Sequence, residues 1–117
     1  MLAPFKQLKV ESERHDGVII ITVEGEIDVY NSWNFKEVLL MATHKRFKVM
    51  VVNMRKVSFI DSTGLGVLVS SLKNVRSYGG KIKLVIINDD INKIFQVTSL
   101  DTLFEIYPTI EKTLESI

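Results

Sequence analysis

Hydrophobic residues follow two different periods along the chain, and the two periods predict strands and helices in alternation. Strand patterns occupy residues 5–13, 18–23, 49–53, 81–87 and 103–107. The runs 18–23 and 49–53 are apolar and rich in β-branched residues, which is typical of strands buried inside a sheet. Asp16-Gly17 separates the first two strand patterns and predicts a hairpin turn between them.

Between these strands, apolar residues recur at the spacing of one face of a helix. Helices are predicted over residues 32–43 and 65–78, after residues 88–90, and at the end of the chain. Asn31 and Ser32 are good N-caps for the first helix. Gly79-Gly80 ends the second helix, and Pro108 suits the first turn of the last one.

The resulting order is β β α β α β α β α, and strands joined by single helices are expected to be parallel with right-handed crossovers. The opening hairpin makes the sheet mixed. We therefore predict an α/β fold with a mixed, mostly parallel sheet of about four or five strands and about four helices, mainly on one face. The length favours a single domain over residues 1–117.

Charge and residue content exclude several classes of function. The chain has 15 basic and 14 acidic residues, so its net charge provides no drive toward nucleic acid or an anionic membrane. It has no cysteine, which favours an intracellular protein, and His15 and His44 are a poor basis for a metal site. No apolar run is long enough to span a bilayer, and the N-terminus lacks the apolar region of a signal peptide. We expect a cytoplasmic protein without a metal.

The segment 59–66 joins a strand to the start of a helix and contains Asp61, Ser62, Thr63 and two glycines. The first N–H groups of a helix have no partner within it, and the helix dipole favours anions there. This segment is therefore the place where a phosphate could be accepted or a partner could bind.

Enzymatic uses of this segment find little support. The third position of the dinucleotide fingerprint is Val69, and no Gly-Lys-Ser/Thr phosphate loop is present. Ile60 stands where the nucleophile elbow requires glycine. For Asp61, a role as helix cap or partner contact is favoured over a role as catalytic acid. Nothing in the sequence places Asp28 beside it as the second carboxylate that a catalytic pair would need. We predict no catalytic residue and no cofactor.

The hydroxyls of Ser62 and Thr63 suggest a different use. A phosphoryl group there would add about −1.5 to −2 charges beside Asp61, and the helix dipole would offset this by roughly 0.3–1 kcal/mol. The fold should tolerate such a group while the local surface changes sharply, as a switch requires.

With these residues identified, the chain resembles the STAS-domain anti-sigma factor antagonists, the anti-anti-sigma family of bacteria. Residues 25–32 resemble the Gly-x-Leu/Ile-Asp turn of the family before its first helix, residues 51–66 its signature strand-loop-helix, and residues 95–104 its Thr-x-Leu-Asp-x-x-Phe stretch. Two positions depart from the family pattern. Trp33 is bulky for the start of the first helix and is either exposed as a contact or packed against the sheet, of which the general tendency of tryptophan favours packing. Asn53 stands where the strand often carries Asp.

The resemblance implies a regulator of transcription that is not an enzyme. Such an antagonist binds an anti-sigma factor that is also a serine kinase, and so frees a sigma factor. The kinase uses ATP and magnesium to phosphorylate the serine after the signature Asp, which is Ser62 here, and a separate phosphatase reverses the reaction. Thr63 is a lesser candidate acceptor. The partner-binding residues implied are Asp28, Asn31, Ser32, Asp61, Ser62, Thr63, Gly64 and Leu65.

Two other hypotheses remain open at this point. The chain could be a scaffold or sensor STAS module of a signalling assembly, without a serine switch. It could also be a small enzyme that uses Asp61 or Ser62, although a base, a metal set and a cofactor loop are all lacking.

Overall fold

The computed structural model describes residues 8–117. The elements in chain order are β1 (Lys9–His15), β2 (Val18–Ile27), α1 (Ser32–His44), β3 (Val49–Ile60), α2 (Ser62–Arg76), β4 (Lys81–Val85), α3 (Asp89–Val97), the 3₁₀ turn η1 (Leu100–Thr102), β5 (Glu105–Tyr107) and α4 (Ile110–Glu115). The predicted order of strands and helices is confirmed. The first strand was predicted from residue 5, and residues 5–7 lie outside the described part of the chain.

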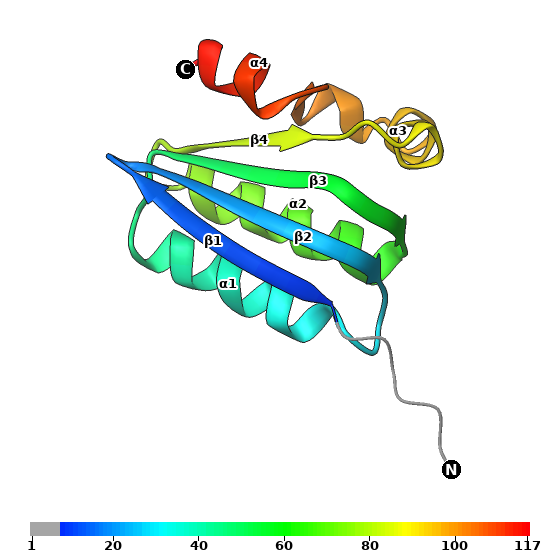
Figure 1. Cartoon of the computed structure of the whole chain (residues 1–117). Helices are drawn as coiled ribbons and strands as arrows, with labels where there is room; N and C mark the ends of the chain where they lie inside the picture. Colours follow the sequence, from blue (N-terminus) through cyan, green and yellow to red (C-terminus); the bar gives the residue numbers. More distant parts are fainter. Residues whose placement is uncertain (1–7) are drawn as a thin grey trace.

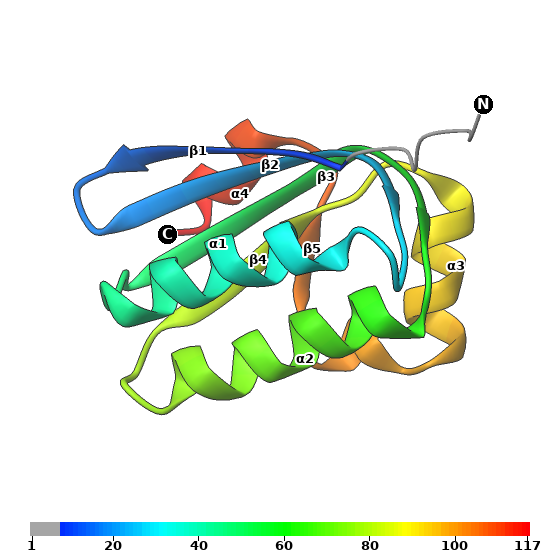
Figure 2. The same cartoon turned by 90° about the horizontal axis from the view of Figure 1, so that it is seen from below.

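The five strands form one sheet in the order β1-β2-β3-β4-β5. β1 pairs with β2 antiparallel, and the other three pairs are parallel, so the predicted mixed, mostly parallel sheet is confirmed. Helices α1 and α2 cover one face, α4 lies on the opposite face, and α3 lies near the end of the sheet (Figures 1 and 2). Helices were predicted mainly on one face, and α4 is the exception.

The two faces of the sheet bury cores of different size. The larger core includes Phe35 and Leu39 of α1, Leu68 of α2 and Phe95 of α3, all 0% exposed. The smaller core lies under α4 and comprises Ile20, Val49, Val51 and Val85, with Val18 and Ile110 packed against it. Because both faces are covered, strands β2 and β3 have continuous apolar runs instead of strict alternation.

β2 and β3 are longer than the sequence pattern predicts. The predicted strands end at residues 23 and 53, but both strands stay paired with each other up to the contact between Ile27 and Ile60. Register shifts occur between Thr22 and Glu24 and again between Gly25 and Glu26. Such irregularities break the two-residue period, so the ends of both strands look like loops in the sequence.

Three further predictions need correction. Helix α2 begins at Ser62 and not at residue 65, because Asp61 caps it. Pro108 lies before α4 and not in its first turn, since Thr109 is the N-cap and accepts a hydrogen bond from the Lys112 N–H. Trp33 was expected to pack against the sheet, but its side chain is 64% exposed.

Within residues 8–117, no helix is both long enough and apolar enough to cross a membrane.

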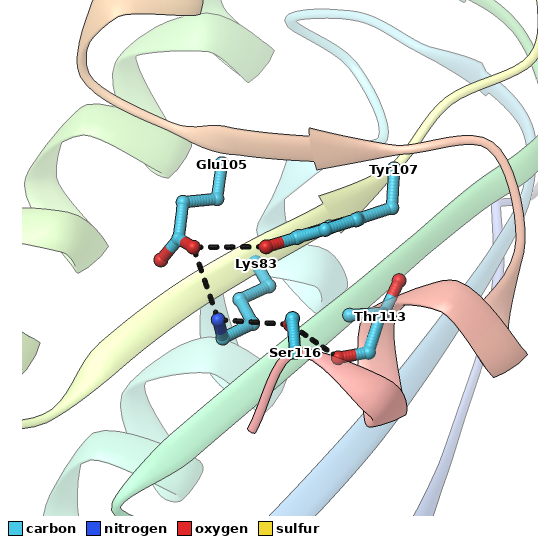
Figure 3. A network of polar contacts seen from close by, with 5 residues as sticks. All are labelled: Lys83, Glu105, Tyr107, Thr113 and Ser116. Atoms are coloured by element: carbon cyan, nitrogen blue, oxygen red, sulfur yellow. Dashed lines mark hydrogen bonds and ion pairs between the residues drawn. The ribbon is translucent and has the colours of Figure 1, made fainter.

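A buried lysine connects α4 to the edge of the sheet (Figure 3). Lys83 of β4 is 2% exposed, and its Nζ donates to Glu105 Oε1 at 3.1 Å and to Ser116 Oγ at 3.0 Å. The Tyr107 hydroxyl also donates to Glu105 Oε1, at 2.9 Å, and Ser116 Oγ donates to the carbonyl oxygen of Thr113. The ammonium group is therefore compensated by the half-exposed carboxylate of Glu105, and the network connects β4, β5 and α4.

This network should make stability depend on pH. The hydrogen bond from Lys83, followed by that from Tyr107, lowers the pKa of Glu105 below its ordinary value of 4.5. A carboxyl group with a lowered pKa in the folded state stabilises the fold above its unfolded pKa, and this contribution is lost as the pH falls through the folded pKa. The free energy of unfolding should therefore decrease as the pH falls from about 4.5 downward, and Glu105→Gln should flatten this part of the curve.

The measurement is urea unfolding between pH 7 and pH 3. Glu111→Gln is the matched control, because Glu111 lies exposed on α4 and forms no ion pair among the described residues. Equal flattening by both substitutions would contradict the role assigned to Glu105.

Candidate functional site

The candidate site lies where β2 and β3 end together. Because Ile27 and Ile60 are paired, the segments that follow them lie side by side: the β2–α1 turn (residues 28–31) and the start of α2 (Figure 2). These segments are more than 30 residues apart in the sequence. The parallel pairing of the two strands brings together the Asp28 and Asp61 regions that the sequence could not place.

Asp61 joins the two segments through its carboxylate. Oδ1 accepts the Gly64 N–H at 3.1 Å and so caps α2, while Oδ2 accepts the Val29 N–H of the β2–α1 turn at 3.0 Å. The Asp61 N–H itself donates to the Ile27 carbonyl at 3.1 Å. The predicted capping role of Asp61 is confirmed, and the link to the turn is an addition that the sequence did not reveal.

The β2–α1 turn is also fixed from within. Asp28 Oδ1 accepts the N–H groups of Tyr30 at 2.9 Å and Asn31 at 3.1 Å. Asn31 Oδ1 accepts the Asp28 N–H at 2.9 Å, and Asn31 Nδ2 donates to the Glu26 carbonyl at 2.6 Å. Asn31 occupies the N-cap position of α1 but makes no capping bond with its side chain, so its predicted role as a cap is replaced by this bracing of the turn.

The predicted partner-binding residues differ in how accessible they are. Ser62 is exposed as the first residue of α2, and Asp28, Asp61, Thr63 and Leu65 are partly exposed. Asn31, Ser32 and Gly64 are buried, so these three could only shape the surface that a partner would meet.

Gly64 is required for close packing at the start of α2. A Cβ at this position would lie 2.7 Å from Ile27 Cγ2 and 2.7 Å from Ile60 Cγ1. Gly66, two residues further on, has open space where its Cβ would be. Of the two glycines in this segment, close packing therefore requires only Gly64.

This pair of glycines allows a matched test of the site's packing. Gly64→Ala should reduce the free energy of unfolding by about 1–3 kcal/mol, because overpacking displaces the two isoleucines at the ends of β2 and β3. Gly66→Ala should instead raise it by roughly 0.5–1 kcal/mol through helix propensity. Denaturant unfolding measures both values. A stable Gly64→Ala variant would show that the two strand ends are not held as closely as described.

An aromatic patch adjoins the site and consists of Val29, Tyr30 and Trp33. Their side chains are 61%, 67% and 64% exposed. Val29 and Tyr30 lie within the turn between Asp28 and Ser32 but are not among the individual partner-binding residues that the resemblance implies, and the sequence favoured the interior for Trp33. The available signal was that Trp33 lies off the apolar stripe that Phe35 begins, on the opposite side of the helix. Because Asp61 holds the Val29 N–H, the turn that carries Val29 and Tyr30 is fixed to the start of α2, where Ser62 lies.

Comparison with known proteins identifies the family. The model of the STAS domain family matches residues 9–113, and the chain belongs to this family. The anti-sigma-B factor antagonist of Listeria monocytogenes is 36% identical over 94 residues, which cover 80% of this chain and 82% of that protein. The protein of the same name from Staphylococcus aureus is 31% identical over 99 residues, which cover 85% of this chain and 92% of that protein.

Solved structures agree with this fold. The crystal structure of an anti-sigma factor antagonist from Mycobacterium paratuberculosis has a TM-score of 0.87 at 24% identity, covering 94% of this chain and 93% of that one. SpoIIAA of Bacillus has a TM-score of 0.73 both in its unphosphorylated form, at 17% identity, and in its phosphorylated form, at 19%. Each covers 92% of this chain, and the matches cover 96% and 98% of the SpoIIAA chains.

Proposed function

We propose that this chain is an anti-sigma factor antagonist whose binding to an anti-sigma factor is switched by phosphorylation of Ser62. One observation carries the proposal. Ser62 is exposed at the first position of α2, directly after the aspartate that fixes both this helix and the β2–α1 turn. A charge added at Ser62 would therefore appear on the exposed surface beside the junction of α2 and the β2–α1 turn.

The relatives support the antagonist role. Two of them are named anti-sigma-B factor antagonists, and SpoIIAA has been solved both with and without its phosphoryl group. Its two forms match this chain with the same TM-score. A phosphorylated antagonist can therefore keep this fold, which supports a switch that acts on the surface and not on folding.

The physical basis of the switch is the cost of burying charge. The phosphoryl group would add about −1.5 to −2 charges beside the Asp61 carboxylate. A partner that covers Ser62 would have to desolvate both groups, at several kcal/mol per uncompensated ion. Only about 1.4 kcal/mol is needed to weaken binding tenfold, so phosphorylation would be sufficient to release the partner.

The proposal gives the chain no catalytic step. The serine kinase activity belongs to the anti-sigma factor, and a separate phosphatase restores the unphosphorylated form. Asp28, Asp61, Thr63 and Leu65 would contact the partner together with Ser62, while Asn31, Ser32 and Gly64 would keep the surface in shape. The aromatic patch would extend this contact area.

Capture of a partner from native cytoplasm tests the proposal. Wild type and Ser62→Ala should hold a small ATP-binding kinase, whereas Ser62→Asp should hold at least about ten times less. Ser70→Asp is the matched control, because Ser70 is an exposed serine on the same helix, and it should bind as wild type does. Mass spectrometry would identify the captured protein.

Equal capture by Ser62→Asp and wild type would contradict the serine switch. The chain would then be better explained as a scaffold or sensor module with the same fold.

A further inference from the structure

Basic side chains gather at the end of the molecule remote from Ser62. β2, β3 and β4 are parallel and begin there, and α1 and α2 end there, at the left of Figure 1. The basic residues at this end include Arg14, Lys45, Arg46, Lys48, Arg76 and Lys81, while Glu13 and Asp16 are the acidic residues of the nearby hairpin. The net charge of +1 for the whole chain therefore hides a local excess of positive charge.

Helix dipoles explain only part of this excess. Lys45 and Arg46 follow the C-terminus of α1, and Arg76 lies in the last turn of α2, where cations are favoured. Helix dipoles do not account for Lys48 and Lys81, because Lys48 directly precedes β3 and Lys81 is the first residue of β4. The Lys81 N–H donates to the Lys48 carbonyl at 2.8 Å, so the two lysines are neighbours on adjacent strands.

These two lysines line a pocket of about 450 Å³. The pocket is open to solvent, and its size is within the range of small-molecule sites. No aspartate or glutamate is among its lining residues, which are Lys48, Val49, Tyr78, Gly79, Gly80, Lys81, Lys83, Ser116 and Ile117.

The positive charge of the pocket is only partly compensated. Lys83 forms an ion pair with Glu105 at 3.1 Å. The charge of Lys81 is a further cause that lowers the pKa of the Glu105 carboxyl group, after the hydrogen bonds from Lys83 and Tyr107. Within the described residues, Lys48 and Lys81 themselves form no ion pair. A further cation lies next to one lining residue, because the Arg46 guanidinium is 5.8 Å from the centre of the Tyr78 ring.

Two glycines form part of the pocket wall. Gly79 has a φ of 82°, a conformation that favours glycine, and a Cβ at Gly80 would lie 2.7 Å from Val75 Cγ1. The chain between α2 and β4 therefore passes the pocket as bare backbone, and close packing against Val75 requires the glycine at position 80.

We propose that this pocket binds a small molecule that carries several phosphate charges, with Lys48 and Lys81 as its ammonium ligands. Several cations at separate positions suit a ligand with more than one negative group better than a single carboxylate. The site is independent of Ser62 and of the proposed partner surface, which lies at the other end of the strands.

Titration of the isotope-labelled full chain with tripolyphosphate and with inorganic phosphate, followed through backbone amide NMR shifts, tests this site. Tripolyphosphate should bind more tightly than phosphate, with shifts confined to residues around the pocket. The double variant Lys48→Gln/Lys81→Gln should bind it at least about tenfold more weakly. The control Lys36→Gln/Lys93→Gln removes two exposed lysines of α1 and α3 and should leave the affinity unchanged.

Equal weakening by the two double variants, or shifts spread over the whole surface, would overturn the proposal. Because all four lysines are exposed, the variants should fold, and thermal unfolding checks this. Tighter binding of a DNA duplex or of anionic lipid vesicles than of tripolyphosphate, lost with Lys48 and Lys81, would also overturn it, in favour of a surface for extended polyanions.

Discussion

Replacing both Tyr30 and Trp33 by serine is expected to weaken partner binding at least about 100-fold, which corresponds to roughly 2.7 kcal/mol. Both side chains are exposed by nearly two thirds. Tyr30 lies in the β2–α1 turn, which hydrogen bonds to Asp28 and Asp61 hold in place, and Trp33 lies in the first turn of α1. Exposed, pre-positioned Tyr and Trp side chains are the residues that most often contribute 2 kcal/mol or more to an interface. Calorimetric titration with the captured anti-sigma factor measures the change.

The aromatic prediction needs a control for general loss of apolar surface. Val97→Ser/Leu103→Ser removes two apolar side chains that are 76% and 43% exposed and lie at the end of α3 and beside η1. This variant should bind the partner as wild type does. Both double variants should unfold at the wild-type denaturant concentration. Full affinity of the Tyr30→Ser/Trp33→Ser variant would show that the partner binds elsewhere.

Asp61→Ala is expected to lower the free energy of unfolding by about 2–4 kcal/mol. The substitution removes two hydrogen bonds to a carboxylate, and bonds to charged groups contribute roughly 1.5–3 kcal/mol each when they are well shielded. Two such bonds would sum to about 3–6 kcal/mol, and the partial exposure of Asp61 reduces the expected loss to the value given. Asp61→Asn retains one acceptor oxygen and should lose about half as much.

Hydrogen exchange separates the two roles of this carboxylate. In Asp61→Ala the Val29 amide proton should exchange much faster, because its acceptor is gone. The Tyr30 amide proton should keep its acceptor on Asp28. Asp101→Ala, at an exposed aspartate, is the control and should stay within about 0.5 kcal/mol of wild type. Unchanged exchange at Val29 would rule out the link between α2 and the β2–α1 turn.

The sequence predicted the order of the elements because each helix has a regular apolar stripe and each central strand a β-branched run. The ends of β2 and β3 escaped prediction, since register shifts near Gly25 disturb the two-residue period. The position of Trp33 was wrong because a general tendency of tryptophan to be buried outweighed its place off the stripe of α1.

The site was predictable only in part. Asp61 and Ser62 could be identified because the capping aspartate, the serine hydroxyl and the first turn of the helix are adjacent in the sequence. The bond from Val29 to Asp61 spans 32 positions, and no local pattern reports it. The basic run 44–48 is visible in the sequence, where it is most simply interpreted as a solvated loop. Its closeness to Lys81 could not be predicted, because only the parallel strands bring these distant residues to one end.

The central claim is that a phosphoryl group on Ser62 separates this chain from its partner. The most direct measurement is the dissociation constant of the captured anti-sigma factor for wild type before and after quantitative phosphorylation at Ser62, with the site of modification confirmed by mass spectrometry. The account predicts at least about tenfold weaker binding after phosphorylation, with the same circular dichroism spectrum and with Ser62→Ala unaffected by the same treatment. An unchanged dissociation constant for fully phosphorylated protein would contradict the account.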